Sequence, residues 1–498
     1  MNLAMLLEMV ADGAGDRIVL GSRAGGLTGA GLLDRARHAA DRFRRSGAEH
    51  VVLLDLNSEA VPISLFGAAL AGLPFVPVNY RLTDDQLASI LGRVSPGVVV
   101  AGEETAGRVP TGSGLTVVTR AEILEPAAGG AAPDAELPWV EPDEIAVLLF
   151  TSGTTGEPKA AVLRHRHLVS YIIGSVEFLS AEEDEAQLIS VPPYHIAGVS
   201  SILSSLYSGR RMLYMPGFDP AGWVDTVETE KVTQAMVVPT MLGRILDRVD
   251  ETGRDMSSLR HLSYGGGRMP VETIERAIKV LPDVNFVNAY GLTETSSTVA
   301  VLTPDDHRQA MASSDPVVRG RLGSVGRPLP TVEVEIRDPD GQPVAEGERG
   351  EVWVRGEQVA GEYLGRSALT DDGWFRTRDA GRLDEGGFLF LDGRLDDVIV
   401  RGGENLSPGE IEDALMSHPA VAEAAVVGVP DPEWGEAVAA AVVLERGASC
   451  STEELQQWVR DRLRSTKAPK LVQFRQEMPY NETGKLLRRV IREEIAAD

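Results

Sequence analysis

A segment rich in hydroxyl groups and glycine, Thr151-Ser-Gly-Thr-Thr-Gly-Glu-Pro-Lys159, has the chemistry of a phosphate-binding loop. It follows the apolar run Leu148-Leu-Phe150, which is typical of a strand. Hydroxyls and the backbone N–H groups that glycine leaves accessible can donate to phosphate oxygens, and the lysine adds a positive charge. The Gly-Lys-Ser/Thr ending of a Walker A loop is absent. The candidate phosphate contacts are Thr151, Ser152, Gly153, Thr154, Thr155, Gly156 and Lys159. An ordinary surface turn is the alternative interpretation.

Two other segments carry glycine or an acid directly after a buried-looking strand. Tyr264-Gly-Gly-Gly-Arg268 follows one such strand, and Asn288-Ala-Tyr-Gly-Leu-Thr-Glu-Thr295 follows another. The glycines permit close approach of a flat chemical group. His195 stands in Pro193-Tyr-His-Ile-Ala-Gly198 without a second residue at metal-ligand spacing. We therefore expect His195 to line a pocket or the core, not to bind a metal.

The elements that must position these residues alternate between helical and extended patterns. Strands separated by helices predict parallel α/β packing. Helices are expected at 28–46, 60–71 and 82–91, and strands at 51–55, 75–78, 98–101, 235–238, 261–264 and 286–289. Residues 102–143 are rich in glycine, alanine and proline, and we interpret them as a surface excursion.

The character of the chain changes twice towards its end. Residues 323–393 contain period-two alternation and the turn signal Asp338-Pro-Asp-Gly341, which predict a β-rich subdomain. A smaller α+β unit follows, with strands at 398–400, 424–429 and 437–444, helices at 408–418 and 452–463, and a basic closing helix from Lys485. The fold class is therefore α/β. Residues 1–394 are predicted to form a large domain of stacked α/β subdomains and residues 395–498 a small mobile domain.

Composition narrows the choice of partners. The 498 residues carry a formal net charge of −26, which disfavours binding to nucleic acid or to an anionic membrane. An anionic substrate must then be met by a local positive site. Cys450 is the only cysteine, so neither an intramolecular disulfide nor a thiolate metal cluster is expected. The amino-terminal residues indicate an amphipathic helix and not a signal peptide, and no apolar run is long enough to span a bilayer. A cytoplasmic monomer or homodimer is expected.

Several segments together resemble the adenylate-forming superfamily of acyl-CoA synthetases, aryl-acid ligases, adenylation domains and luciferases. The resemblance begins with Thr151–Lys159 and extends over nearly the whole chain. The matching segments after that loop, in order, are Val191-Pro-Pro-Tyr-His-Ile196, Asn288–Thr295, Gly347-Glu-Arg-Gly-Glu351, Trp374-Phe-Arg-Thr-Arg-Asp379, Asp392-Gly-Arg-Leu-Asp396, Arg401-Gly-Gly-Glu-Asn405 and Asn481-Glu-Thr-Gly-Lys485. So many segments in a fixed order leave no room for coincidence.

The resemblance implies a role for each matched residue in joining a carboxylate to ATP. Lys485 would bridge the attacking carboxylate and the α-phosphate, and Glu294 would hold Mg²⁺ beside the phosphates. The catalytic set is Lys485, Glu294, Thr151 and His195. Besides the loop, the nucleotide-contacting set is Gly265, Gly266, Gly267, Asn288, Ala289, Tyr290, Gly291, Thr293, Asp379, Leu391, Arg394, Asp396, Gly402 and Gly403. Without the resemblance, Lys485 would be interpreted as a lysine that caps a basic helix, and Asp379 would be interpreted as a turn residue.

The resemblance also implies a second step in which the small domain rotates about Asp396 and a thiol enters. Gly402 and Gly403 would then let a pantetheine arm pass closely. Two departures affect this picture: Arg401 stands where many relatives have lysine, and Gly267-Arg268 where the family has alanine.

The implied activity is ATP-dependent formation of an acyl adenylate from a small carboxylic acid, with pyrophosphate release and transfer to coenzyme A. Tyr194, His195, Met236, Tyr264 and Ala289 are the predicted substrate-pocket residues and suggest a medium-chain or aromatic acid. The alternatives are loading of a carrier protein and adenylation of nitrite by a diazotase of secondary metabolism. A third alternative is a nucleotide-binding module without catalysis. Such a module would not need Lys485, Glu294 and Asp396 together, so their presence argues against it.

Overall fold

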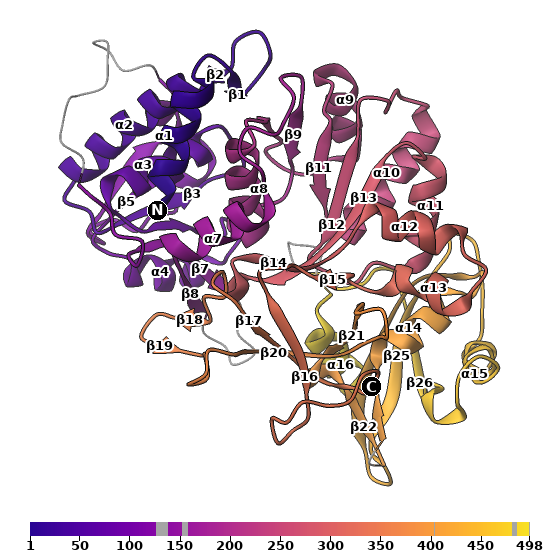
Figure 1. Ribbon diagram of the computed structural model, residues 1–498. Helices are drawn as coiled ribbons and strands as arrows, with labels where there is room; N and C mark the ends of the chain where they lie inside the picture. The colour runs from indigo at the N-terminus through magenta and orange to yellow at the C-terminus, as the bar shows by residue number, and fades with distance from the viewer. Residues whose placement is uncertain (126–137, 152–157, 403, 481–485, 498) are drawn as a thin grey trace.

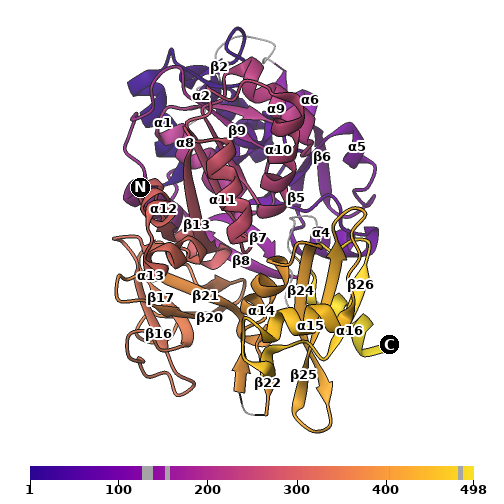
Figure 2. The same cartoon turned by 90° about the vertical axis from the view of Figure 1, so that its right-hand side faces the viewer.

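The computed structural model describes residues 1–125, 138–151, 158–402, 404–480 and 486–497. Within these residues the chain forms two large sheets, a four-stranded sheet and a five-stranded sheet (Figures 1 and 2). This is a mixed α/β architecture with a large amino-terminal domain of sheets and a smaller carboxyl-terminal domain, as the sequence predicts. No helix in the described part of the chain is long and apolar enough to cross a membrane.

The first large sheet has the strand order β19-β18-β8-β7-β4-β3-β5-β6. Its strands are β3 (His50–Leu54), β4 (Phe75–Pro77), β5 (Gly97–Ala101), β6 (Leu115–Thr119), β7 (Ile145–Thr151), β8 (Lys159–Arg164), β18 (Glu362–Tyr363) and β19 (Arg366–Ser367). The helices between them are α3 (Ala60–Ala71), α4 (Asp84–Arg93), α5 (Glu103–Ala106) and α6 (Arg120–Leu124), with α7 (His165–Ser175) after β8. Every residue of α3 is buried, because this apolar helix packs inside the main core with α1 (Leu3–Ala14) and α2 (Gly29–Arg45).

The second large sheet has the order β15-β14-β13-β12-β11-β9-β10-β1-β2. Its strands are β1 (Ile18–Leu20), β2 (Leu27–Thr28), β9 (Ala186–Ile189), β10 (Arg211–Tyr214), β11 (Gln234–Val237), β12 (His261–Gly265), β13 (Asn285–Leu292), β14 (Ser297–Leu302) and β15 (Arg327–Pro328). Its helices are α8 (Ile196–Tyr207), α9 (Pro220–Glu230), α10 (Pro239–Thr252), α11 (Val271–Val280), α12 (Pro304–Ala312) and α13 (Pro316–Gly320). Strands β9, β11, β12 and β13 run parallel, so their carboxyl ends meet at one edge of the sheet.

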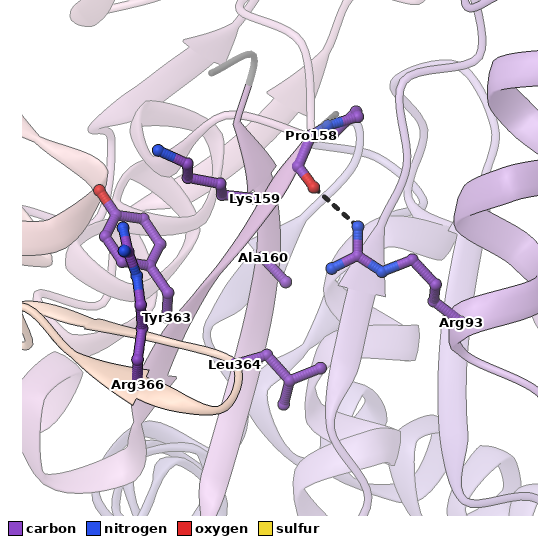
Figure 3. A pocket seen from close by; sticks show the side chains of 7 residues that line it. All are labelled: Arg93, Pro158, Lys159, Ala160, Tyr363, Leu364 and Arg366. Atoms are coloured by element: carbon purple, nitrogen blue, oxygen red, sulfur yellow. Dashed lines mark hydrogen bonds between the residues drawn. The ribbon is translucent and has the colours of Figure 1, made fainter. Parts of the chain in front are cut away.

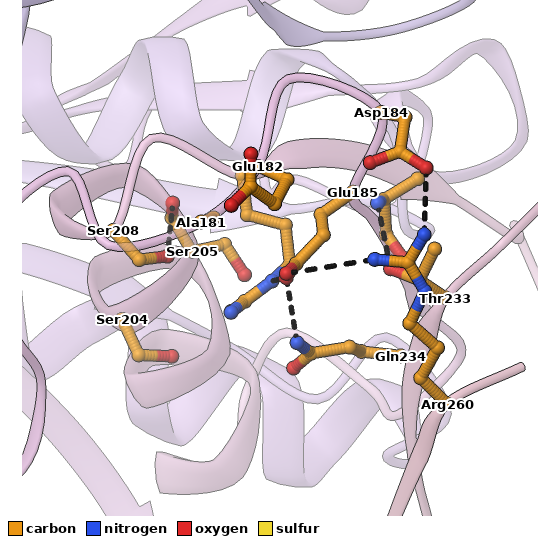
Figure 4. A network of polar contacts seen from close by, with 12 residues as sticks. Ala181, Glu182, Asp184, Glu185, Ser204, Ser205, Ser208, Thr233, Gln234 and Arg260 are labelled. Atoms are coloured by element: carbon orange, nitrogen blue, oxygen red, sulfur yellow. Dashed lines mark hydrogen bonds and ion pairs between the residues drawn. The ribbon is translucent and has the colours of Figure 1, made fainter.

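The opposite edge of this sheet is tied by a polar network (Figure 4). Glu185, which precedes β9, accepts hydrogen bonds from Gln234 of β11 at 2.8 Å and from Arg210 at 3.0 Å. Arg260, which precedes β12, pairs with Asp184 at 2.7 Å. These residues all lie at the amino ends of parallel strands, so we assign them to fixing the strand order and not to chemistry.

The two smaller sheets come from the last third of the chain. The four-stranded sheet consists of β16 (Glu333–Arg337), β17 (Gly350–Arg355), β20 (Phe375–Leu383) and β21 (Leu389–Arg394). The five-stranded sheet consists of β22 (Ile399–Arg401), β23 (Glu404–Leu406), β24 (Val421–Asp431), β25 (Gly435–Leu444) and β26 (Leu471–Arg475), covered by α14 (Pro408–Met416), α15 (Thr452–Arg460) and α16 (Arg488–Ala497). In both views the β22–β23 hairpin lies at the end of this domain remote from the two large sheets.

One expectation about the first large sheet is wrong. Residues 102–143 are not only a surface excursion, because β6 continues this sheet beside β5 and is flanked by the short helices α5 and α6. β6 is an edge strand whose side chains are mostly exposed, so it lacks the apolar run by which buried strands are recognised. Similarly, β18 pairs with β8 although it lies inside the segment that we predicted to form a β-rich subdomain.

Candidate active site

The predicted phosphate loop begins at the end of one strand and ends at the start of its neighbour. Strands β7 and β8 pair antiparallel, with Thr151 opposite Lys159, and the Thr151 hydroxyl lies 3.4 Å from the carbonyl oxygen of Lys159. Residues Ser152, Gly153, Thr154, Thr155 and Gly156 lie outside the described part of the chain. The two ends of the loop are thus fixed by strand pairing, at the point where β7 leaves the core.

A cavity of about 420 Å³ lies beside the end of this loop. Its lining residues are Arg93, Pro158, Lys159, Ala160, Tyr363, Leu364 and Arg366 (Figure 3). Arg93 donates a hydrogen bond to the carbonyl oxygen of Pro158 at 2.7 Å, and the Lys159 ammonium and the Arg366 guanidinium both approach the Tyr363 ring. The lining contains three cations and no carboxylate, so it attracts anions locally on a protein of net charge −26.

Glu294 is held by residues that the sequence motifs did not include, one of which, Tyr363, also lines the cavity. It lies in a short 3-10 helix (Thr293–Thr295) directly after β13, and its Oε1 accepts a 2.6 Å hydrogen bond from the Tyr363 hydroxyl. Burial, and then the charge of Glu294, raise the pKa of Tyr363, so the phenol stays protonated and remains the donor. Gln358 donates to the carbonyl oxygens of Thr295 and Thr298 and fixes the turn. The sequence signal for this role of Tyr363 is weak: the residue lies between two segments that resemble family motifs.

Tyr290 and Asp379 form a second cluster next to the first. The Tyr290 hydroxyl donates to Asp379 at 2.6 Å, and Arg394 on the neighbouring strand pairs with the same carboxylate at 3.2 Å. Asp379 is 8% exposed, and its backbone N–H donates to the hydroxyl of Thr377. Burial and the Asp379 charge raise the pKa of Tyr290, which keeps its hydroxyl protonated. Leu391 lies on the same strand as Arg394, and the β-bulge of this strand falls between Leu391 and Gly393.

The predicted pocket residues gather at the carboxyl ends of β9, β11, β12 and β13. Gly265 stands opposite Ala289, and a Cβ on Gly265 would overlap the carbonyl oxygen of Ala289. Met236 lies on the adjacent strand, while Asn288 is buried and donates to the Ser324 carbonyl oxygen at 3.1 Å. Glycine is required at two further positions of these segments. Gly266 has a φ of +77°, and a Cβ on Gly291 would overlap the Ser297 carbonyl oxygen, whereas Gly267 is exposed and a Cβ there would make only ordinary contacts.

Tyr264 is a core residue as much as a pocket residue. Its side chain is completely buried and its hydroxyl lies 2.8 Å from Nε2 of His307 on α12. Because Nδ1 of His307 contacts the Thr303 carbonyl oxygen, Nδ1 carries the proton and Nε2 accepts from the tyrosine. The Tyr264 hydroxyl is therefore already used, and only its ring can face a ligand.

Tyr194 and His195 lie between β9 and α8, just before the helix begins. Their ring centroids lie 4.7 Å apart, and Tyr80 packs on Tyr194 edge-on at 5.7 Å. Burial lowers the pKa of His195 to about 4, and its buried Nε2 has no hydrogen-bond partner among the described residues. His195 is therefore neutral at physiological pH and adds no charge to the pocket.

The neutrality of His195 can be measured directly. With ¹³C/¹⁵N-labelled histidine, the ring signals that disappear in His195→Gln should not move in the wild type between pH 8 and about pH 5.5, because protonation begins only near the lowered pKa. The spectrum of the unfolded protein, where the same ring is solvated, serves as the control. A titration midpoint near 6.5 would contradict the enclosed position of the ring.

Of the carboxyl-terminal candidates, Asp396 and Gly402 lie in the described part of the chain. Asp396 is exposed and pairs with Arg378 at 2.7 Å. Gly402 has a φ of +58°, and a Cβ there would press on Trp434. Arg401 lies over the Trp434 ring and donates to the Thr466 carbonyl oxygen. Gly403 and Lys485 lie outside the described residues.

One further group of side chains of the metal-ligand type lies in the carboxyl-terminal domain, outside the candidate site. His418, Cys450 and Glu454 approach one another, with 3.9 Å between Nε2 of the histidine and Sγ of the cysteine. The backbone N–H of Ala420 donates to Nδ1 of His418, which leaves Nε2 as the ring nitrogen that can donate to the other two groups. Burial raises the pKa of Cys450 to about 11, and the thiol stays protonated. The cluster is a hydrogen-bonded contact between α14 and α15.

Comparison with known proteins identifies the family. The sequence profile of the AMP-binding enzymes matches residues 7–364, and that of the AMP-binding enzyme C-terminal domain matches residues 410–485. A feruloyl-CoA synthase of an Amycolatopsis species is 35% identical over 475 residues, 94% of this chain and 93% of that protein. A fatty acid–[acyl-carrier-protein] ligase of Streptomyces coeruleorubidus is 33% identical over 478 residues, 93% of this chain and 90% of that protein.

The solved structures agree with this result. The crystal structure of ATP-bound MatB from Rhodopseudomonas palustris has a TM-score of 0.87 and 27% identity, covering 100% of this chain and 99% of that one. The fold and the site thus define an adenylate-forming enzyme, and the chain belongs to the AMP-binding enzyme family. Within it the chain is of the acyl- and aryl-CoA synthetase branch: an ATP-dependent, AMP-forming acid–thiol ligase that acts on a small-molecule acid.

Proposed function

We propose that this chain activates an aromatic or medium-chain carboxylic acid as its adenylate and transfers the acyl group to coenzyme A in the cytoplasm. The observation that carries the choice of acid is that the predicted pocket residues Tyr194, neutral His195 and Met236 carry no charge. A pocket lined by them would accommodate an apolar or aromatic acid and would offer no ion pair to a second carboxylate. The 35% identity with a feruloyl-CoA synthase supports the same choice.

The nucleotide would lie across the ends of β12 and β13. In this proposal Tyr290 packs on the adenine, and Asp379, oriented by Tyr290 and Arg394, accepts hydrogen bonds from the ribose hydroxyls. Because the glycines at the strand ends have no side chains, the adenine ring can lie flat against the backbone. The residues assigned to this surface are Gly265, Gly266, Gly267, Asn288, Ala289, Gly291, Thr293, Leu391 and Arg394.

The phosphates would lie between the loop and Glu294. Thr151 and the residues up to Lys159 would donate to them, and the cationic cavity lined by Arg93 and Arg366 would receive the departing pyrophosphate. Glu294 suits Mg²⁺, because it is a half-buried carboxylate with one oxygen bonded to Tyr363 and another left for a hard cation beside phosphate oxygens. A bound Mg²⁺ would neutralise phosphate charge as the carboxylate approaches.

The thiol step would use a rotated small domain. Gly402 lies in the β22–β23 hairpin, which in both views points away from the large sheets, so it must move to meet an adenylate at β13. The proposed pivot is Asp396, which is exposed and pairs with Arg378. His195 would separate the acid pocket from the path of the thiol.

Proline at position 396 tests the pivot. Asp396→Pro restricts φ at that residue and should lower the rate of thioester formation at least tenfold more than the rate of adenylation. Acid-dependent ATP–pyrophosphate exchange measures the first step, and conversion of synthetic acyl adenylate with coenzyme A measures the second. Asp396→Ala, which keeps backbone freedom, is the matched control. Equal losses in both steps would show that the two half-reactions do not depend on rotation here.

The function itself is tested by a panel of acids. Pyrophosphate release from ATP should be fastest with hydroxycinnamic, benzoic, indolic or C6–C10 fatty acids, and slow with acetate, malonate and nitrite. Coenzyme A and a phosphopantetheinylated carrier protein are then compared as acceptors of the adenylate. Release that is selective for nitrite would replace this proposal by the diazotase. A preference for the carrier would favour the alternative that the 33% identity with an acyl-carrier-protein ligase supports.

A further inference from the structure

Arg268, the unusual residue at the end of the glycine segment after β12, contacts the small domain. Its guanidinium forms an ion pair with Asp413 on α14, 145 positions away in the sequence. Both side chains are about two-fifths exposed, at 42% and 41%. The contact therefore links the proposed adenine surface directly to a helix of the carboxyl-terminal domain.

Room for the Arg268 side chain is provided by a glycine on the same helix. Gly409 lies one turn before Asp413, and a Cβ at Gly409 would overlap the Arg268 guanidinium. The helix face at positions 409 and 413 is thus shaped to receive this arginine: one residue leaves the space and the other supplies the charge. Glu272 and Glu412 also lie near Asp413 and complete a group of three carboxylates. Arg268 is the counter-ion of Asp413, while Arg488 pairs with Glu412.

This pair differs from the cross-domain contacts that lie close to the proposed pivot. Ser407 bonds to the Asp392 carbonyl oxygen at 2.9 Å across only 15 positions of chain that include Asp396. Partners so close to a pivot stay near each other when a domain rotates. Arg268 and Asp413 are held together only by the relative orientation of the two domains, so their contact is specific to the orientation seen here.

The orientation seen here has the β22–β23 hairpin remote from the large sheets (Figures 1 and 2). In this orientation Gly402 cannot contact an adenylate at β13. The orientation is therefore compatible with the first half-reaction and not with the thiol step. We infer that Arg268 and Asp413 are positioning residues that hold the small domain in the orientation for adenylate formation and must separate before the thiol step. This inference rests on the proposed function in requiring two orientations.

The pair is half exposed, so its effect on the equilibrium between orientations is moderate. An ion pair of this kind shifts an equilibrium by a few-fold, and a like-charge contact opposes it similarly. Asp413→Asn should lower the rate of adenylate formation about threefold and leave the conversion of synthetic adenylate to thioester unchanged or faster. Arg268→Glu, which places a fourth carboxylate in the group, should lower adenylate formation about tenfold. The double variant Arg268→Glu/Asp413→Arg should return it to within about twofold of the wild type.

Gly409→Val is a variant that keeps both charges. Its side chain occupies the space of the guanidinium, so it should reproduce the Asp413→Asn pattern. If Arg268 acts by touching the nucleotide, Asp413→Asn and Gly409→Val will have no effect and the double variant will not recover. If both half-reactions fall together in Asp413→Asn, the pair is merely structural. Either result overturns the inference.

A distance measurement separates this inference from the proposed function. Spin labels can be attached at Lys279→Cys on α11 and Glu453→Cys on α15, on a Cys450→Ser background that removes the only native cysteine. With ATP present, pulsed electron paramagnetic resonance then measures the distance between the labels, which reports the domain orientation. The fraction of molecules whose label-to-label distance matches the orientation in this structure should fall in Arg268→Glu and return in the double variant. An unchanged population overturns the inference whichever acid is the substrate. Absence of acid-dependent pyrophosphate release in the wild type would instead count against the proposed function.

Discussion

Lys485→Ala is expected to lower acid-dependent ATP–pyrophosphate exchange about 10²- to 10³-fold, with ATP affinity nearly unchanged. Adenylation brings a carboxylate to the α-phosphate, so two anions must meet on a protein whose net charge is −26. A single flexible ammonium that bridges both oxygens acts mainly in the transition state, whereas ATP is also held by the other assigned residues. Exchange kinetics and equilibrium binding of ATP measure the two quantities separately.

The same variant should behave differently in the second half-reaction. Because the proposed rotation withdraws Lys485 before the thiol enters, Lys485→Ala should convert synthetic acyl adenylate to thioester at close to the wild-type rate. Arg489→Ala is the matched control, since Arg489 follows four positions later in the sequence, on α16. Its side chain is 77% exposed, and among the described residues it pairs with Glu493 of the same helix. Near-normal exchange in Lys485→Ala, or an equal loss in Arg489→Ala, would contradict the assignment.

Most of what the sequence predicted about the large sheets depends on local patterns. The helix expected at 60–71 is α3 with the same bounds, because a nearly continuous apolar run of that length is recognisable by itself. The strands at 51–55 and 98–101 are β3 and β5 with small shifts at their ends. Edge strand β6 was missed because only one of its five residues is buried. Local sequence patterns thus predict the helices and strands that are buried on both faces. They do not predict an edge strand such as β6, whose side chains are mostly exposed.

The site divides in the same way. Glu294 and Asp379 could be predicted because each lies in a short segment that resembles a family motif. Tyr363, which fixes Glu294, is 69 positions away and stands on a two-residue strand without a pattern of its own. The partner of Arg268 is more distant still. Contacts of this kind arise from the packing of separate sheets and helices, and no periodicity in one sequence encodes them.

Asp379→Ala is expected to raise the KM for ATP about 100-fold, while kcat at saturating ATP falls less than tenfold. Asp379 is the acceptor for the Tyr290 hydroxyl at 2.6 Å and the counter-ion of Arg394 at 3.2 Å, in a position only 8% exposed. Hydrogen bonds to a charged acceptor each contribute about 1.5–3 kcal/mol, so losing those to the two ribose hydroxyls accounts for a factor of this size. Steady-state kinetics with ATP as the varied substrate give both constants.

Variants of the neighbouring residue and of the nucleotide distinguish ribose binding from a structural defect. Tyr290→Phe removes the hydrogen bond to Asp379 but leaves its carboxylate beside Arg394, so its KM for ATP should rise far less than that of Asp379→Ala. The wild type should discriminate against 2′-deoxy-ATP and 3′-deoxy-ATP, and Asp379→Ala should have lost this discrimination because the partner of the missing hydroxyl is gone. If Asp379→Ala still rejects the deoxynucleotides as the wild type does, the ribose is bound elsewhere, and Asp379 serves only to pair Tyr290 with Arg394.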